Sequence, residues 1–317
     1  MPTTPKLLEF DHGITAVDTD YVRPQLDASH LIVRDGRAAF VDTGTTHSVP
    51  LLLAALEAKG LAREAVDYVL LTHVHLDHAG GAGALMRELP QAQVLVHPRG
   101  AAHLVEPDKL IAGTRAVYGE TEFARLYGDI VPIPAARVRA VEDNTRIRLG
   151  RSELLLIHTP GHALHHYCIV DAVSRSVFTG DSFGISYRVF DTDRGAFVFP
   201  ATTPTHFDPE QAHASIERIL SYQPEACFLT HYSRVTDLPR LAADLHAGLE
   251  RLAEIVRRCA QAPDPVADMQ HEIHAWLVGA VRAHGCTRDQ ATVDDWLAMD
   301  VALNAKGLAV WLARSHK

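Results

Sequence analysis

One ten-residue segment limits the possible folds of this chain more than any other feature. Residues 72–81 read Thr-His-Val-His-Leu-Asp-His-Ala-Gly-Gly and directly follow an apolar run at residues 68–71. The run predicts a buried strand, and the segment after it carries four side chains that can bind a metal. These are His73, His75, Asp77 and His78. Imidazole and carboxylate ligands are typical of zinc, iron and manganese, so the segment predicts a metal site at the end of a strand.

Four further segments with related residues occur in order along the chain. Residues 39–44 read Ala-Phe-Val-Asp-Thr-Gly, residues 159–166 read Thr-Pro-Gly-His-Ala-Leu-His-His, residues 178–182 read Phe-Thr-Gly-Asp-Ser, and residues 228–232 read Phe-Leu-Thr-His-Tyr. Together with residues 72–81 they resemble the HxHxDH, TPGH and GD motifs of the metallo-β-lactamase superfamily, in its glyoxalase II-like form. The resemblance covers residues 39–232, roughly the first three quarters of the chain.

The resemblance implies a site for two divalent metal ions. His73, His75 and His162 would hold the first ion, Asp77, His78 and His231 would hold the second, and Asp181 would bridge both. Zinc is the expected metal, with iron or manganese as alternatives, because this set of ligands accepts all three. The implied chemistry is hydrolysis by a hydroxide that bridges the ions, with Asp77 and Asp181 as the catalytic carboxylates.

Other residues are expected to support the ligands or to contact the substrate. Asp42 is expected to hold the ligand loop in place, and His166 to support a ligand, although His165 competes for that role. Tyr187, Phe190 and Tyr232 are expected to contact the substrate. For the aromatic loop at residues 183–209, an equal alternative is that its rings only attach the loop to the C-terminal helices.

The distribution of strands and helices predicts an α/β (α+β) fold in two parts. The resemblance implies a four-layer αββα sandwich over residues 1–235, and a hairpin with an Asp-Gly turn is predicted at residues 31–41. Residues 48–60 and 79–89 predict helices, and residues 99–135 predict an inserted helical segment. From residue 236 to residue 317 the apolar spacing is only helical, which predicts an α-helical appendage with helices at residues 264–284 and 288–313.

Composition restricts the partners of the protein. The net charge of −9 comes without a basic stripe, so a small-molecule substrate is expected rather than nucleic acid or an anionic membrane. No apolar stretch is long enough to predict a membrane span. The four cysteines are scattered and the N-terminus does not resemble a secretory signal, which together predict a cytoplasmic protein. The sequence does not decide between a monomer and a homodimer.

The first functional hypothesis is a dinuclear metal-dependent hydrolase that acts on an ester, thioester or lactone. Retention of Asp77 favours this class over true β-lactamases. The alternatives are an iron-dependent redox enzyme, similar to persulfide dioxygenases or di-iron oxygen-handling proteins, and a regulatory protein with a vestigial hydrolase site. The sequence identifies neither the substrate nor the metal.

Overall fold

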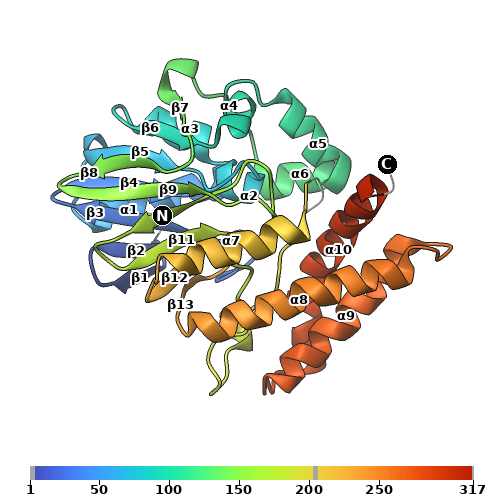
Figure 1. Ribbon diagram of the computed structural model, residues 1–317. Helices are drawn as coiled ribbons and strands as arrows, with labels where there is room; N and C mark the ends of the chain where they lie inside the picture. Colours follow the sequence, from blue (N-terminus) through green and yellow to red (C-terminus); the bar gives the residue numbers. More distant parts are fainter. Residues whose placement is uncertain (1–3, 203–205, 316–317) are drawn as a thin grey trace. The chain divides into compact units, whose positions relative to one another are not determined.

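The computed structural model describes residues 4–202 and 206–315. Across these residues the strands assemble into a seven-stranded sheet and a six-stranded sheet, with helices between and after them (Figure 1). Two sheets combined with helices confirm the predicted α+β class. The described residues cluster into two compact units. Unit 1 comprises residues up to 158, 165–180 and 230–233, and unit 2 comprises residues 159–164, 181–229 and those from 234 onward.

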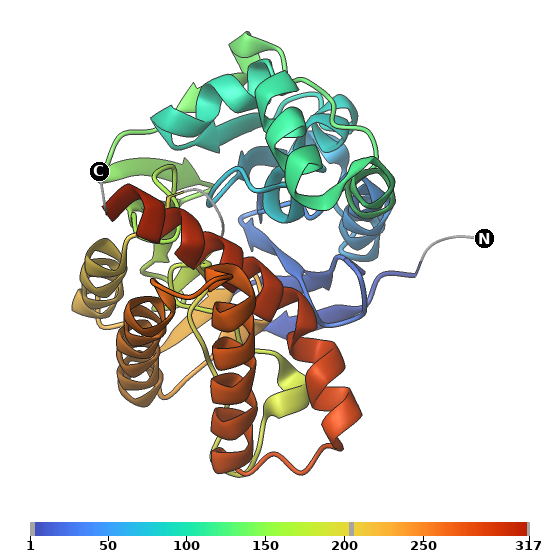
Figure 2. The ribbon, with the colours of Figure 1, turned by 90° about the vertical axis from the view of Figure 1, so that its right-hand side faces the viewer.

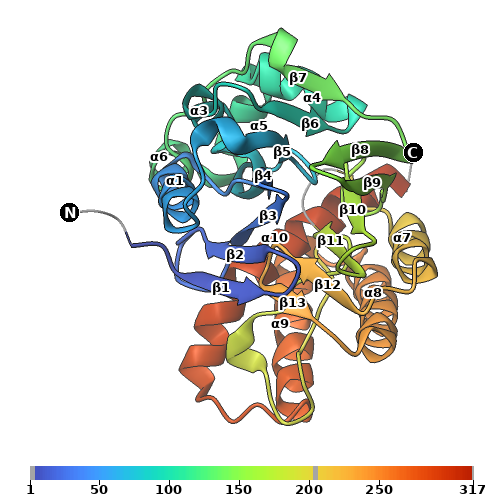
Figure 3. The ribbon, with the colours of Figure 1, turned by 90° about the vertical axis from the view of Figure 1, so that its left-hand side faces the viewer.

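The seven-stranded sheet belongs to unit 1 and follows the order of the chain. Its strands are β1 (Leu7–Phe10), β2 (Ile14–Asp18), β3 (Ala28–Arg34), β4 (Arg37–Val41), β5 (Val66–Leu70), β6 (Gln93–Val96) and β7 (Val138–Ala140). Strands β1 to β4 pair antiparallel, and β4 to β7 pair parallel (Figure 3). The predicted hairpin is confirmed, because β3 and β4 meet at Asp35 and Gly36, which have φ angles of 50° and 76°. Two adjacent positive φ values are typical of the tight turn that joins such strands.

Unit 1 also contains six α-helices among its described residues. They are α1 (Val49–Ala58), α2 (Leu76–Ala79), α3 (Ala82–Glu88), α4 (Pro98–Val105), α5 (Asp108–Tyr118) and α6 (Glu120–Tyr127). α1 confirms the helix predicted at residues 48–60, and α4 to α6 form the predicted insertion. The helix predicted at residues 79–89 is confirmed by α3, which begins at Ala82, after Gly80 and Gly81. A Cβ atom on Gly81 would lie 2.5 Å from the carbonyl oxygen of Thr45, so only glycine allows this close approach to the loop after β4.

Unit 1 also holds four antiparallel strands of the second sheet. These are β8 (Thr145–Leu149), β9 (Ser152–His158), β10 (Tyr167–Asp171) and β11 (Ser176–Gly180). A buried ion pair joins the two sheets, since Arg34 Nη2 of β3 lies 2.6 Å from Asp171 Oδ2 of β10. A paired charge of this kind connects the layers at a defined position, because separating the two groups would leave each one buried without its counter-charge.

His30 lies on β3 inside the protein and makes stability depend on pH. Its side chain is buried against Phe178, and burial lowers its pKa to about 3. An unfolded histidine binds a proton below about pH 6.5, so between these two values the unfolded chain holds more protons and acid favours unfolding. The free energy of unfolding should therefore fall by about 2 kcal/mol between pH 6.5 and pH 5 through this residue alone.

His30→Gln should remove that contribution, because glutamine does not titrate. Urea unfolding of the wild type and the variant at pH 7 and pH 5 measures it. The wild type should lose about 2 kcal/mol more than the variant on acidification. Equal losses in both proteins would show that folding does not lower the pKa of His30.

Unit 2 is mainly helical. Its elements are α7 (Pro209–Ser221), β12 (Ala226–Leu229), α8 (Leu238–Cys259), α9 (Pro265–Ala283) and α10 (Gln290–Ser315), and β13 (Ser233–Val235) follows β12. α8 confirms the helical apolar spacing predicted after residue 236, since it buries a face of leucines that includes Leu241, Leu245, Leu249 and Leu252. α9 and α10 confirm the two later helices (Figure 2). The domain boundary at residue 235 stays a prediction. Within residues 4–202 and 206–315, no helix has both the length and the apolar character that crossing a membrane requires.

Candidate metal centre

Three predicted ligands meet in unit 1. Asp77 and His78 lie on the short helix α2, and His231 follows β12. Asp77 Oδ2 lies 3.5 Å from His231 Nε2 and 3.8 Å from His78 Nε2. One ligand atom from each of the three residues lies within 4.8 Å of the others, as a shared cation requires. The structure therefore brings together the three side chains that the resemblance assigns to the second ion, with Asp77 directed into the group.

The outer nitrogens of both histidines are held by acceptors. His78 Nδ1 lies 2.8 Å from Asp42 Oδ2, and His231 Nδ1 lies 2.9 Å from the carbonyl oxygen of Leu26. Each Nδ1 therefore carries the proton and donates it, which turns the Nε2 lone pair toward Asp77. Two lone pairs and a carboxylate oxygen that converge repel one another unless a positive charge lies among them. The donor set thus fits a divalent metal ion.

Asp42 connects the segments that carry these ligands. The residue is fully buried and has a φ of 56°, a backbone conformation that aspartate tolerates better than most residues. Its carboxylate accepts hydrogen bonds from the Thr72 amide at 2.8 Å, from the Thr72 hydroxyl, from His78 Nδ1 and from the Thr230 hydroxyl at 2.8 Å. One carboxylate thus orients both the loop before α2 and Thr230, the residue next to His231. Asp42 therefore lies where its expected supporting role requires it.

His73 and His75 lie beside this group. The Thr72 hydroxyl donates to Asp42 and accepts from His73 Nδ1 at 3.1 Å, so Asp42 also orients His73 indirectly. His73 Nε2 lies 2.8 Å from His75 Nδ1, and the His73 ring centroid lies 4.0 Å from that of His78. The four side chains of the first motif therefore lie together in unit 1.

Both candidates for a supporting histidine lie near His73. The ring centroid of His166 is 5.0 Å from that of His73, and the ring centroid of His165 is 6.2 Å from it. A Cβ atom at Gly180 would lie 2.6 Å from His166 Nε2, so this glycine leaves room for the His166 ring. The role of His166 as a support stays a prediction.

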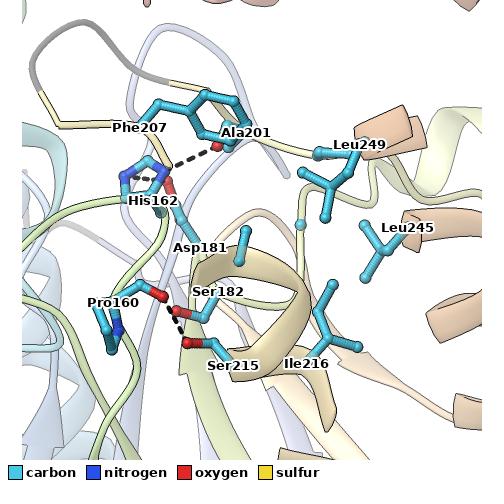
Figure 4. A pocket seen from close by; sticks show the side chains of 13 residues that line it. Pro160, His162, Asp181, Ser182, Ala201, Phe207, Ser215, Ile216, Leu245 and Leu249 are labelled. Atoms are coloured by element: carbon cyan, nitrogen blue, oxygen red, sulfur yellow. Dashed lines mark hydrogen bonds and ion pairs between the residues drawn. The ribbon is translucent and has the colours of Figure 1, made fainter. Parts of the chain in front are cut away.

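Unit 2 contains a second pair of predicted ligands with the same hydrogen-bonding pattern. His162 Nδ1 lies 3.1 Å from the carbonyl oxygen of Ala201, and His162 Nε2 lies 3.5 Å from Asp181 Oδ2 (Figure 4). The carbonyl again accepts the Nδ1 proton, so the Nε2 lone pair faces a buried carboxylate. This pair also fits a metal ion.

A small cavity in unit 2 borders His162 and Asp181. Its volume is about 20 Å³, close to the space that one water molecule needs. Apolar parts of its walls come from Phe207, from Ile216 of α7 and from Leu245 and Leu249 of α8 (Figure 4). The cavity therefore places an apolar surface next to two predicted ligands.

The three aromatic residues expected to contact substrate are buried among other side chains. The Tyr187 hydroxyl donates to Asp300 at 3.0 Å, and the Tyr187 ring lies 5.3 Å from that of Trp296 on α10. Phe190 is fully buried and its ring lies 6.5 Å from that of Trp296. This is the packing that the alternative hypothesis for the aromatic loop expects. Tyr232 is buried with Ala16 and Ala28. Contact of these residues with substrate stays a prediction.

Sequence reasoning missed several residues that hold the ligands. Thr72 and Thr230 each directly precede a ligand histidine, and this position is the signal that could have identified them. Leu26 had no such signal, because it holds His231 only through its backbone carbonyl. The next residue, Asp27, is fully buried, and burial raises its pKa to about 7, an effect that the nearby His231 and His78 oppose.

Comparisons with known proteins agree with the motifs. Residues 25–231 match the family model described as the metallo-beta-lactamase superfamily. A metallo-beta-lactamase fold-containing protein of Sulfurisphaera tokodaii is 28% identical over 224 residues, which are 69% of this chain and 77% of that protein. A hydroxyacylglutathione hydrolase of Aeromonas hydrophila is 28% identical, and the match covers 60% of this chain and 54% of that protein. An atrochrysone carboxyl ACP thioesterase of Passalora fulva is 24% identical, and the match covers 72% of this chain and 56% of that protein.

A solved structure shows the same fold. The archaeal metallo-beta-lactamase superfamily protein from Sulfolobus tokodaii aligns with a TM-score of 0.66 and 22% identity, over 94% of this chain and 98% of that chain. This likeness confirms the predicted sandwich fold followed by C-terminal helices. The chain spans about half the length of the hydrolase and the thioesterase that it matches.

Proposed function

The chain belongs to the metallo-β-lactamase superfamily, and on this basis we propose that it is a hydrolase that uses two divalent metal ions to cleave an ester, thioester or lactone. One observation carries the proposal. His78, His231 and His162 each have Nδ1 held by an acceptor, and each Nε2 faces a carboxylate. Histidines fixed in this way are typical of metal ligands.

The proposed ligand sets follow the order of the motifs. His73, His75 and His162 would hold the first ion, Asp77, His78 and His231 would hold the second, and Asp181 would bridge both. Zinc is the proposed metal, with iron and manganese as alternatives, because imidazole and carboxylate ligands accept all three. The group formed by Asp77, His78 and His231 within unit 1 supports the second set.

The side chains of the protein would hold and orient the metal ions for this chemistry. When bound, two divalent ions supply an ionised water at neutral pH and polarise the substrate carbonyl. Asp42 holds His78, the Leu26 carbonyl holds His231 and the Ala201 carbonyl holds His162 in the tautomer that binds metal. Asp77 and Asp181 provide the negative charge that retains the ions and orients the attacking water.

Three further observations support the substrate class and the compartment. The relatives include a hydroxyacylglutathione hydrolase and an acyl carrier protein thioesterase, which favours an acyl substrate with a reactive carbonyl. A small molecule is the proposed substrate, because the chain carries a net charge of −9. The four cysteines are buried and scattered along the chain, which supports a reducing compartment such as the cytoplasm.

Metal removal and reconstitution test the proposal. The protein is treated with a chelator, then reloaded anaerobically with zinc, manganese or iron, and assayed on esters, thioesters, lactones and phosphodiesters. We expect about two ions per chain and turnover of at least one acyl substrate that is lost with the metal and restored by zinc. Oxygen uptake with iron and without ester turnover would favour the redox alternative. Metal binding without any turnover would favour a regulatory role.

A further inference from the structure

Asn304 is a buried polar residue of α10 and belongs to the same compact unit as His162. Only 2% of the residue is exposed. Its Oδ1 atom lies 2.7 Å from the Thr202 amide nitrogen and 2.9 Å from the Thr202 hydroxyl, and its Nδ2 atom lies 3.4 Å from the Pro200 carbonyl oxygen. A carboxamide offers an acceptor and a donor at once, so this one side chain holds the backbone on both sides of Ala201.

A single peptide group connects Asn304 with His162. The carbonyl of Ala201 and the amide N–H of Thr202 belong to the same planar trans unit and point in opposite directions. The carbonyl accepts the proton of His162 Nδ1 at 3.1 Å (Figure 4), while the N–H donates to Asn304 Oδ1. Because the unit is rigid, it cannot turn on one side without turning on the other. Asn304 therefore fixes the acceptor that orients His162.

The two hydrogen bonds of this peptide group also strengthen each other. An amide whose N–H is donated carries more negative charge on its carbonyl oxygen, since hydrogen bonds in a chain polarise one another. A stronger acceptor at Nδ1 makes the Nε2 atom of His162 a more basic ligand. That Nε2 atom lies 3.5 Å from Asp181 Oδ2. Asn304 thus acts on the proposed ligand atom from two hydrogen bonds away.

Other contacts hold the chain just before this peptide group. Phe199 and Ile185 exchange two backbone hydrogen bonds of 2.9 and 3.1 Å. A Cβ atom on Gly248 of α8 would lie 2.7 Å from Pro200 Cδ, so α8 packs closely on the same segment. These contacts fix the backbone as far as Pro200. The next peptide groups depend on Asn304, which is the reason to expect an effect from this one side chain.

We propose that Asn304 is a positioning residue of the metal centre, which holds His162 through the peptide group between Ala201 and Thr202 so that Nε2 is turned toward the metal. The inference rests on the proposed function in treating His162 as a metal ligand. It gives α10 a direct part in setting metal affinity, in addition to its packing against the aromatic loop.

Zinc affinity of two Asn304 variants tests the proposal. Asn304→Leu keeps the approximate size of the side chain but neither accepts nor donates, so it should weaken zinc binding roughly tenfold. Asn304→Asp still accepts from the Thr202 amide and should bind zinc within about twofold of the wild type. Wild-type affinity in Asn304→Leu would overturn the proposal. An equal loss in both variants would overturn it too, because only one of them lacks the acceptor.

Leu297→Ala is the matched control for lost stability of α10. Leu297 is fully buried and lies two turns before Asn304. Its truncation should lower the denaturant midpoint of the metal-free protein, but it should leave zinc affinity within about twofold of the wild type. Zinc affinity that falls as far in Leu297→Ala as in Asn304→Leu would mean that Asn304 acts only through the stability of the helix, which would contradict the proposal.

A double-mutant cycle with His162 tests the proposed route. In a His162→Ala background the peptide group has no imidazole to orient, so Asn304→Leu should then change zinc affinity less than about twofold. A tenfold loss that persists in this background would show that Asn304 acts on the metal by a route that does not include His162.

NMR of the wild type decides the question if Asn304→Leu fails to fold. Zinc on Nε2 makes the Nδ1 proton of His162 a stronger donor, which should polarise the peptide group and move the Thr202 amide proton downfield. An amide proton that does not move when zinc binds would overturn the proposal. A wild type that binds no zinc would contradict the proposed function instead. In that case the metal-free proteins still test Asn304, because its replacement by aspartate should keep the Nδ1 proton of His162 and its replacement by leucine should exchange that proton roughly fivefold faster.

Discussion

Asp181→Asn should reduce turnover by roughly 10³-fold or more, because the proposed bridge supplies several kcal/mol of charge stabilisation to the two ions and the reacting water. The Asp181 side chain is buried and its Oδ2 atom lies 3.5 Å from His162 Nε2. Asparagine keeps the shape of the side chain but removes its charge and directs an amide group toward a metal position. Metal content should fall together with turnover, which metal analysis and steady-state kinetics measure on the same preparation.

Asp193→Asn provides the matched control for the loss of one negative charge. Asp193 is exposed on the loop after β11, so its replacement should leave metal content and turnover at the wild-type level. Asp181→Asn with normal metal content and normal turnover would contradict the bridging assignment. Loss of turnover with both ions retained would assign Asp181 a role in the chemical step but not in binding the metals.

Asp42→Ala should weaken metal binding by about 10–100-fold, although Asp42 is not itself a proposed ligand. Its carboxylate accepts from Thr72, His78 and Thr230, so alanine leaves several buried donors without their acceptor. The cost should also appear in the free energy of unfolding, at about 1–3 kcal/mol for each buried group left unsatisfied. Competition with a zinc chelator measures the affinity, and denaturant unfolding of the metal-free protein measures the stability.

Thr230→Val tests how much the hydrogen bond from Thr230 to Asp42 contributes to metal affinity by itself. This change removes one hydrogen bond to the carboxylate but leaves the bonds from His78 and Thr72 in place. We expect a smaller loss of affinity than for Asp42→Ala, since the His78 tautomer is still fixed. An Asp42→Ala protein that binds zinc as tightly as the wild type would show that the histidines do not need this carboxylate.

Local patterns predicted many elements of the fold correctly. The Asp35-Gly36 turn, the helix at α1 and the leucine face of α8 follow from backbone preference and apolar spacing, which act over a few residues. The helix predicted at residues 79–89 is α3, but it begins only at Ala82. Gly81 lies against the distant loop after β4, and no pattern in the local sequence indicates that approach.

The neighbours of the ligands were harder to predict than the ligands themselves. Asp42 ends a strand within a recognisable motif, but the Leu26 carbonyl that holds His231 has no side-chain signature at all. Tyr187 and Phe190 were expected to contact substrate because of their position after Asp181. Their burial against Trp296 depends on a helix more than a hundred residues away in the chain.

The sequence by itself determined which side chains are available as ligands and in which order they occur, because the types and spacing of residues such as His73, His75, Asp77 and His78 are properties of the chain. Only the tertiary structure decided which nitrogen of each histidine faces inward. That choice depends on acceptors from distant segments, such as Asp42 for His78 and Leu26 for His231. A hydrogen bond forms only between atoms about 3 Å apart, and folding alone brings such segments to that distance.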